Sequence, residues 1–465
     1  MFFERIYEEG LAQASYFVGC QATKEAIVID PKRDVDTYLR LAERKKYRIT
    51  HVTETHIHAD FLSGSRELAA ATGAQILLSD EGGSDWQYQF DHKGLHDGDT
   101  FMIGNIKFEV IHTPGHTPEH ISFLLTDTPA SDKPSMIFTG DFIFVGDVGR
   151  PDLLEEAAGI AGTKIIGAKQ MFESLKRFKN LADYIQIWPG HGSGSACGKS
   201  LGAIPGSTIG YEKIYNWALL IEDEHIFIDT LLEGQPEAPK YFAMMKKLNK
   251  IDRPLMKNLP QPSIVDITQL EKALKDGIPV IDTRDKMLFA YGHIPGTINI
   301  QNNNDFSNWA GWLLSYDEPF ILISERSQME EVTRKLIRIG LDNIFGFFCN
   351  VEGWIENHSM QPLRHIEACD LKKYIQKNSV EIIDVRGANE FREGHIKNAR
   401  NIHLGSLKER INELDKNREI VMHCAGGDRS STACSILQKA GFQKITNLSG
   451  GFSAWSESGL EFETY

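Results

Sequence analysis

An internal repeat in the second half of the chain constrains its architecture most strongly. VIDTRD (280–285) recurs as IIDVRG (382–387), and YGHIPGTINI (291–300) recurs as EGHIKNARNI (393–402), at an offset of 102 residues. Self-similarity over this length indicates two copies of one supersecondary unit. In each copy, short apolar strands alternate with helical stretches, which favours a mostly parallel sheet covered by helices.

The repeat leaves the first half of this 465-residue chain as a separate domain. Short apolar strands dominate residues 1–200, while residues 163–182 and 211–250 have helical patterns. RPLMKNLPQPS (253–263) contains three prolines and is typical of a linker. We therefore expect a first domain over 1–252, a linker over 253–263, and repeat domains over 264–362 and 363–465.

Composition narrows the functional classes. The formal net charge of −14 argues against nucleic acid and anionic membranes as partners. No apolar run reaches about 18 residues, and the N-terminus MFFERIYEEG lacks the apolar core of a secretory signal. Six scattered cysteines are too sparse for a disulfide framework and are typical of reduced thiols. A cytoplasmic location is expected.

The stretch THIHADFLSG (55–64) places two histidines and an aspartate at alternate positions, on a loop between a strand and a helical stretch. HTPGHT (112–117), TGD (139–141) and PGHG (189–192) each follow a further strand. Histidine and carboxylate side chains on loops at strand ends are suited to holding a metal ion. The ordered set consists of His56, His58, Asp60, His116, Asp141 and His191.

This order of motifs resembles the metallo-β-lactamase superfamily, which implies an αββα sandwich with metal at one edge. ASYFVGC (14–20) and PGHGSGSACGKSLGAIPGSTIGYEK (189–213) are similar, more narrowly, to the persulfide dioxygenases. That resemblance implies one Fe(II) per chain, held by His56, His116 and Asp141 as a facial triad. His58, Asp60 and His191 would then orient the ligands and bind water or substrate.

Phe61 separates two enzyme classes. A dinuclear hydrolase of the glyoxalase II kind would need a histidine directly after Asp60, and phenylalanine cannot bind a metal. Phe61 therefore favours the mononuclear oxygenase over a thioester hydrolase with two metal ions. The hydrolase is the main alternative.

Two further residues of the first domain are candidates for substrate handling. Arg150, in GDVGRPDL, could bind a carboxylate or phosphate of a thiol carrier, or it could form an internal ion pair. Cys197, in SACGK, could relay sulfur or remain a buried thiol. His51, His112 and His120 lack motif support, and we expect no ligand role for them.

The last repeat contains EIVMHCAGGDRSSTACSILQKAGF (419–442), which predicts a strand, a tight loop and a helix. Glycines in such a loop let backbone N–H groups form an anion-binding nest, and the helix N-terminus adds partial positive charge. A thiolate is stabilised there. The loop resembles that of rhodanese sulfurtransferases, which implies a persulfide on Cys424, with Arg429 as a second catalytic residue. The loop around the persulfide would consist of Ala425, Gly426, Gly427, Asp428 and Ser430.

The middle repeat departs from this pattern at the loop. Its aligned segment FILISERSQMEE (320–331) has Ser324 near the place of Cys424 and no glycine loop. Cys349 lies on a later strand and is no replacement, and Cys434 is expected to be structural. This copy therefore resembles an inactive rhodanese domain that serves as a spacer or an interaction surface.

The resemblances share one chemical element, sulfane sulfur. They imply an α/β multidomain enzyme that oxidises a low-molecular-weight persulfide with O₂ to sulfite. The rhodanese would then combine sulfite with a second persulfide to form thiosulfate, or run in reverse. The carrier thiol would be of the glutathione, coenzyme A or bacillithiol type, and the family implies a homo-oligomer. A non-catalytic sulfur sensor or carrier is a further alternative.

Overall fold

The computed structural model describes residues 1–465 except 154, 156–161, 200, 378 and 465. The chain divides into two compact units. Unit 1 comprises Met1–Leu259 with Ile337–Gly340, and unit 2 comprises Pro260–Leu336 with Leu341–Tyr465. The division at Leu259 falls inside the segment 253–263 that reads as a linker. No helix among the described residues is long and apolar enough to cross a membrane.

Unit 1 contains two six-stranded sheets within its described residues. The first sheet follows chain order, and its strands are β1 (Phe2–Glu8), β2 (Gln13–Gly19), β3 (Glu25–Ile29), β4 (Arg48–Thr53), β5 (Gln75–Ser79) and β6 (Lys93–Leu95). The second sheet has the order β12 (Ser207–Thr208), β11 (Gln186–Pro189), β10 (Met136–Gly140), β9 (Ile121–Asp127), β8 (Ile106–His112) and β7 (Thr100–Ile103).

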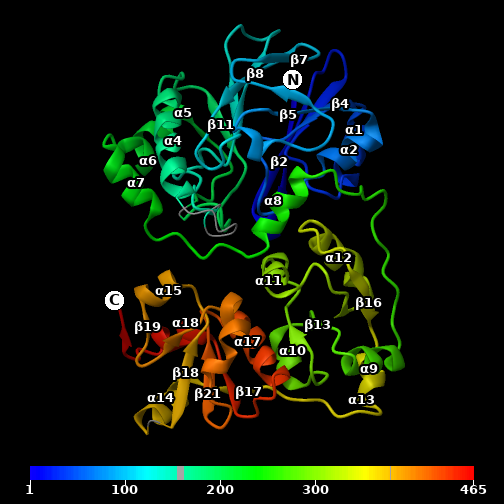
Figure 1. Ribbon diagram of the computed structural model, residues 1–465, viewed down its shortest axis with the longest axis vertical. Helices are drawn as coiled ribbons and strands as arrows, with labels where there is room; N and C mark the ends of the chain where they lie inside the picture. The colour runs from blue at the N-terminus through cyan, green and yellow to red at the C-terminus, as the bar shows by residue number, and fades with distance from the viewer. Residues whose placement is uncertain (154, 156–161, 200, 378, 465) are drawn as a thin grey trace. The chain divides into compact units, whose positions relative to one another are not determined.

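Alternation along the strands builds the layers of unit 1. Tyr16 and Val18 of β2 pack between the two sheets, whereas Phe17 packs on the opposite face. Successive strand side chains point to opposite faces, so one strand serves two cores. The helices α1 (Asp36–Lys45) and α2 (Ser65–Thr72) cover the outer face of the first sheet. The result is the αββα sandwich that the motifs implied (Figure 1).

The outer face of the second sheet is covered by helices from the later part of unit 1. Residues of α4 (Thr163–Phe178), α6 (Trp217–Leu220) and α7 (Glu224–Leu232) pack on Ile111, Leu124, Ile137 and Ile187. The helix expected over 163–182 ends at Phe178, because the amide of Asn180 bonds the carbonyl of Arg177 in a tight turn. The described residues of unit 1 also form the helices α5 (Ile209–Tyr215) and α8 (Phe242–Lys250).

Unit 2 contains two parallel sheets, as the repeat predicts. The sheet of the first copy has the order β14 (Ile298–Asn299), β13 (Val280–Asp282), β15 (Phe320–Ile323) and β16 (Ile344–Phe348). The sheet of the second copy has the order β17 (Arg364–Ile366), β22 (Ile445–Leu448), β21 (Glu419–His423), β18 (Val380–Asp384) and β20 (Arg400–Asn401). A short antiparallel pair joins β19 (His395–Ile396) to β23 (Phe462–Glu463).

Helices cover both sheets of unit 2 (Figure 1). Those of the first copy are α9 (Ile267–Lys275), α10 (Lys286–Tyr291), α11 (Phe306–Leu313), α12 (Met329–Ile337) and α13 (Val351–Ile355). Those of the second copy are α14 (Ala368–Gln376), α15 (Ala388–Glu393), α16 (Leu407–Arg410), α17 (Asp428–Lys439) and α18 (Gly451–Glu457).

The repeated motifs make the same contacts in both copies. Asp282 pairs with Arg284 in the first copy, and Asp384 pairs with Arg386 in the second. His293 and His395 each use Nδ1 to bond a carbonyl oxygen four residues earlier. These buried pairs hold the chain after each strand, which explains why they recur in the sequence.

Candidate metal centre and sulfur site

The first domain brings four histidine and aspartate side chains from different strand ends to one place. His56 follows β4, His116 follows β8, Asp141 follows β10 and His191 follows β11. The ligand atoms of His56, His116 and Asp141 all lie within 4.8 Å of one another. Asp141 Oδ2 is 3.9 Å from His56 Nε2 and 3.6 Å from His116 Nε2. All three side chains are buried.

The hydrogen bonds around the two histidines fix their tautomers. His116 Nδ1 lies 2.8 Å from the carbonyl oxygen of Arg150, which can only accept, so Nδ1 carries the proton. Thr55 Oγ1 donates to Asp30 Oδ2 at 3.0 Å, so it accepts from His56 Nδ1, also at 3.0 Å. Both Nε2 atoms are therefore free to bind a metal. Histidine ligands of metals usually donate the other ring N–H to an acceptor in this way.

Unpartnered buried atoms at this place fit a metal ion. Within the described part of the chain, His56 Nε2 and both carboxylate oxygens of Asp141 have no hydrogen-bond partner. Burial and the neighbouring imidazoles hold the pKa of His56 well below its usual value, and burial lowers the pKa of His116. A buried imidazole nitrogen and a carboxylate that lack protein partners would be costly without a cation.

His58 lies beside this set but has a different partner. Its Nε2 is 3.1 Å from Asp30 Oδ1. Burial alone would lower the pKa of His58, but the carboxylate of Asp30 raises it to about 9. The imidazolium form is thus held by an ion pair with Asp30, and the side chain lies outside the set of His56, His116 and Asp141.

A second group of ligand-type atoms lies next to the first. The side chains of Asp60, His191 and Cys197 are buried, and their ligand atoms also lie within 4.8 Å of one another. His191 Nε2 is 3.3 Å from Asp60 Oδ2 and 3.4 Å from Asp141 Oδ1. Asp141 therefore stands between the two groups, with one oxygen toward each.

Cys197 is a buried thiol rather than an exposed one. Burial, together with the carboxylates of Asp141 and Asp60, raises the pKa of its thiol well above the usual value. A cation bound beside it would reverse this preference and stabilise the thiolate. The sulfur relay remains a prediction.

Phe61 occupies the place where a dinuclear hydrolase carries a histidine, and it is fully buried. Its carbonyl oxygen and that of His58 both accept hydrogen bonds from Asn249 Nδ2 at 2.8 Å. Asn249 Oδ1 in turn accepts from the amide of Ser63. A single side chain of α8 therefore holds the loop that carries His58, Asp60 and Phe61.

The structure supports the internal role of Arg150 over a role in substrate binding. The side chain is 1% exposed and forms a bidentate pair with Asp152, at 2.7 and 2.6 Å. Its remaining Nη1 donates to the carbonyl oxygen of Ala196. These three contacts lie inside the protein and favour the internal ion pair over binding of a thiol carrier. The backbone of Arg150 instead orients His116.

Three residues at the centre had no motif to mark them. Asp30 pairs with His58, and Asn249 holds the metal loop. His120 stacks on His56 with ring centroids 5.1 Å apart, and its Nε2 accepts from the amide of Asp141. The sequence gives no sign of this role of His120, because a hydrogen bond to a ligand's backbone leaves no spacing signal.

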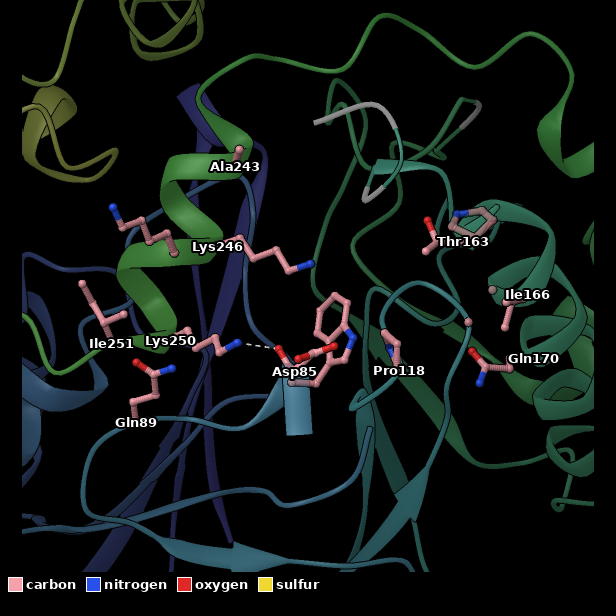
Figure 2. A pocket seen from close by; sticks show the side chains of 15 residues that line it. Asp85, Gln89, Pro118, Thr163, Ile166, Gln170, Ala243, Lys246, Lys250 and Ile251 are labelled. Atoms are coloured by element: carbon pink, nitrogen blue, oxygen red, sulfur yellow. Dashed lines mark hydrogen bonds between the residues drawn. The ribbon is translucent and has the colours of Figure 1, made fainter. Parts of the chain in front are cut away.

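A cavity of about 690 Å³ opens in unit 1 beside the loops after β8 and β10, which carry the candidate metal ligands His116 and Asp141 (Figure 2). Gly115 and Pro118 from the loop of His116 line it, as does Pro151. Figure 2 shows Lys246 and Lys250 of α8 on one side and Ile166 and Gln170 of α4 on the other. Three lysines, Lys246, Lys247 and Lys250, line the cavity.

Lys246 has the most perturbed environment of these lysines. Its Nζ lies 3.5 Å from the centre of the Trp86 ring, where a cation is attracted to the π face. Burial lowers the pKa of Lys246 to about 8 although Glu119 opposes the shift, and burial raises the pKa of Glu119 to about 7. The cavity thus offers a partly buried cation to an anionic ligand.

Cys424 follows β21, and its thiol lies in the predicted anion-binding nest, which forms a cradle of backbone amides. Its Sγ accepts from the amide of Gly427 at 3.1 Å and lies 3.5 Å from Ser430 Oγ. Gly427 has φ of +99°, which a residue with a Cβ atom rarely adopts. Asp428 begins α17, so the sulfur also faces a helix N-terminus.

Three further residues singled out in the two repeats are Arg429, Cys434 and Ser324. Arg429 forms a bidentate pair with Glu390, at 2.6 and 2.8 Å, which raises the pKa of its guanidinium against the effect of burial. Cys434 is buried inside α17, and burial raises the pKa of its thiol well above the usual value. In the first copy Ser324 follows β15, at the place that Cys424 takes after β21.

The first domain is an αββα sandwich with a buried cluster of candidate metal ligands at one edge. The last domain holds a cysteine in an anion-binding loop. The chain is therefore a metal-binding domain joined to thiol-bearing α/β domains. The metallo-beta-lactamase superfamily model matches residues 9–191, and the rhodanese-like domain model matches residues 266–356 and 367–458. The chain belongs to the metallo-beta-lactamase superfamily and carries two rhodanese-like domains.

Individual relatives divide between two activities. A metallo-beta-lactamase structure from Staphylococcus aureus is 47% identical, with a TM-score of 0.70, and the match covers 75% of this chain and 99% of that one. A hydroxyacylglutathione hydrolase of Rhodospirillum rubrum is 33% identical over 38% of this chain and 60% of its own length. The persulfide dioxygenase ETHE1 of Bos taurus is 31% identical over 33% of this chain and 57% of its own length.

A further relative matches a segment of rhodanese length. The thiosulfate sulfurtransferase GlpE of Shewanella oneidensis is 35% identical over 21% of this chain and 98% of its own length. The match to the hydrolase and to the dioxygenase spans less than two thirds of each relative, whereas the match to the sulfurtransferase is nearly complete.

Proposed function

We propose that this protein is an Fe(II)-dependent persulfide dioxygenase coupled to a sulfurtransferase. The observation that carries the proposal is the presence in one chain of two sites suited to sulfane sulfur. One is the buried set of His56, His116 and Asp141, and the other is Cys424 in its amide cradle. Two histidines and one carboxylate with open positions are typical of non-heme Fe(II) oxygenases.

The cavity beside the metal loops is the proposed binding site for the persulfide. Its lysines supply positive charge for the carboxylates or phosphates of a thiol carrier. Glutathione, coenzyme A and bacillithiol all carry such groups. Pro118 and Gly115 border both the cavity and the loop of His116, so a carrier bound there would present its sulfur toward the metal centre.

In the first proposed reaction, RSSH, O₂ and H₂O give RSH and sulfurous acid, which ionises to sulfite. The terminal sulfur is oxidised and O₂ is reduced. When bound, Fe(II) supplies the electron chemistry that activates O₂ and a position for substrate. His56 and His116 would hold the metal through Nε2, and the buried walls around them would exclude bulk water.

In the second proposed reaction, the terminal sulfur of a persulfide on Cys424 passes to sulfite. The S–S bond of the persulfide breaks, a new S–S bond forms in thiosulfate, and the electron pair returns to the Cys424 thiolate. The amide of Gly427 and the hydroxyl of Ser430 would stabilise that thiolate.

Product analysis tests the coupling. Iron-loaded protein would be supplied with a low-molecular-weight persulfide and O₂, and sulfite and thiosulfate would be quantified. We expect thiosulfate from the unaltered protein and sulfite from Cys424→Ser. Cys369→Ser is the matched control, because Cys369 is an exposed cysteine of the same domain. Equal thiosulfate from Cys424→Ser would refute the coupling.

One observation favours the two-metal thioester hydrolase as a second candidate. Cys197 joins Asp60 and His191 in a group of ligand type at the place of a second metal, so it could stand in for the histidine that Phe61 replaces. Metal analysis separates the candidates. Tight binding of two metal ions with cleavage of a glutathione thioester would favour the hydrolase, and one iron without cleavage would exclude it.

A further inference from the structure

The middle repeat, which has Ser324 near the place of Cys424, contacts the helix that begins at the Cys424 loop. The amide of Asn299 donates to Ser435 Oγ at 3.0 Å, and Ser431 Oγ donates to Asn299 Oδ1 at 3.0 Å. Both serines are buried in α17. Asn299 is itself held by the carbonyl oxygens of Asp282 and Arg284 in its own copy. The two copies therefore share a polar, buried junction, and both belong to unit 2.

Lys286 extends this junction into the sulfur site. It is the first residue of α10 in the middle repeat. Its Nζ donates to the carbonyl oxygen of Gly426 at 2.9 Å and lies 2.5 Å from Asp428 Oδ1. Its side chain is 26% exposed, so the contact is partly shielded from water. A cation from one copy thus bonds the catalytic loop of the other.

The peptide that Lys286 bonds is the one that faces the sulfur. The carbonyl of Gly426 and the N–H of Gly427 belong to one planar trans peptide unit, in which they point in opposite directions. The N–H of that unit donates to Cys424 Sγ at 3.1 Å. Holding the carbonyl on one side therefore fixes the direction of the N–H on the other.

The bond also changes the strength of that N–H as a donor. A cation at the carbonyl oxygen polarises the peptide, and hydrogen bonds in such a chain strengthen one another. Glycine at 426 and 427 leaves this peptide free to rotate in the absence of an outside contact. The bond from Lys286 holds the carbonyl side of this peptide, while the N–H side bonds Cys424 Sγ.

We propose that Lys286 of the middle repeat is a positioning residue of the sulfurtransferase site, which orients and polarises the Gly426–Gly427 peptide toward the sulfur of Cys424. The middle repeat is then an integral part of the active site. The inference rests on the proposed sulfurtransferase function. It concerns the step in which the Cys424 thiolate takes the outer sulfur of thiosulfate, so that one S–S bond forms, another breaks, and sulfite leaves with the electron pair.

The test measures persulfide formation on Cys424 from thiosulfate, in the full-length protein, by intact-protein mass and by initial rates across pH. We compare Lys286→Met, Lys286→Arg and Lys272→Met. Lys272 is an exposed lysine of α9 in the same copy and serves as the control. We expect Lys286→Met to load about tenfold or more slowly, with its pH–rate profile displaced to higher pH. Lys286→Arg should restore most of the rate, and Lys272→Met should match the unaltered protein.

The outcomes separate this inference from the function on which it rests. A shifted profile with unchanged thermal unfolding supports positioning, because a merely structural loss would lower stability without moving the profile. Loading of Lys286→Met at the unaltered rate and pH dependence would overturn the inference and leave the sulfurtransferase intact. Failure of the unaltered protein to load Cys424 would overturn both.

Discussion

The ring of Phe61 lies against the ring of His58, with the two centroids 4.3 Å apart. Phe61 is fully buried and directly follows Asp60, a member of the group of Asp60, His191 and Cys197. A dinuclear hydrolase would have a fourth donor at position 61. Phenylalanine offers no donor, and this difference should be reversible by one substitution.

We expect Phe61→His to raise metal binding from about one ion per chain to about two when zinc is supplied in excess, because a histidine completes a tetrahedral donor set. Phe61→Leu is the control, since it keeps the site apolar. Metal would be measured by elemental analysis after gel filtration. Two tightly bound ions in the unaltered protein would contradict the mononuclear interpretation.

Loss of a metal ligand should affect one site and spare the other. His116→Ala is expected to abolish iron retention and O₂ consumption, because the remaining His56 and Asp141 supply too few donors. Sulfur transfer from thiosulfate by Cys424 should continue. His96→Ala is the matched control, because His96 is an exposed histidine of the same unit. Retention of iron by His116→Ala would show that the proposed triad is wrong.

The sequence predicted the sandwich and the two repeat domains because their signals are local. Each of His56, His116 and Asp141 directly follows a strand, and strand ends at one sheet edge lie close together in space. Asn249 and Lys246 carry no such signal. Both lie on α8, far along the chain, and only the packing of that helix shows that Asn249 meets the loop of His58 and that Lys246 lines the cavity.

Packing that the sequence does not reveal also explains why the interpretations of Arg150 and of the middle repeat were incomplete. Arg150 seemed able to bind substrate, but its pairing with Asp152 two residues later was as compatible with the sequence. The sequence of the middle repeat favours a spacer or an interaction surface, because Ser324 stands near the place of Cys424 and the glycine loop is absent. Its contact through Lys286 depends on how the two copies pack, which neither copy's motif reveals.

Binding of the persulfide should weaken as pH rises through about 8. Lys246 has a pKa lowered to about 8, chiefly by burial, so it is cationic below that pH and neutral above it. Loss of this charge should raise KM for an anionic carrier by about tenfold, or about 1.4 kcal/mol. Lys246→Arg should remove the rise because guanidinium stays charged. Lys246→Met should give a high KM at all pH values. An unchanged KM in Lys246→Met would exclude this cavity as the carrier site.

Gly451 should be essential to the shape of the Cys424 loop. Its φ is +59°, and a Cβ atom there would lie 2.4 Å from the carbonyl oxygens of both Cys424 and Ala425. We expect Gly451→Ala to lower the stability of this domain by ~2 kcal/mol or more and to slow sulfur transfer. Gly459→Ala is the matched control, because φ is +66° and a Cβ atom would meet nothing within 4 Å. Equal effects of the two substitutions, measured by thermal unfolding and transfer rate, would leave only backbone strain as the cause.

The central claim is that the metal centre oxidises sulfur with O₂. The most direct measurement is O₂ uptake by anaerobically Fe(II)-loaded protein on addition of a low-molecular-weight persulfide, with sulfite and thiosulfate quantified in parallel. We expect uptake of one O₂ for each sulfur oxidised, with thiosulfate as the main product. Absence of uptake, together with cleavage of a glutathione thioester by the same sample, would contradict the dioxygenase and establish the hydrolase in its place.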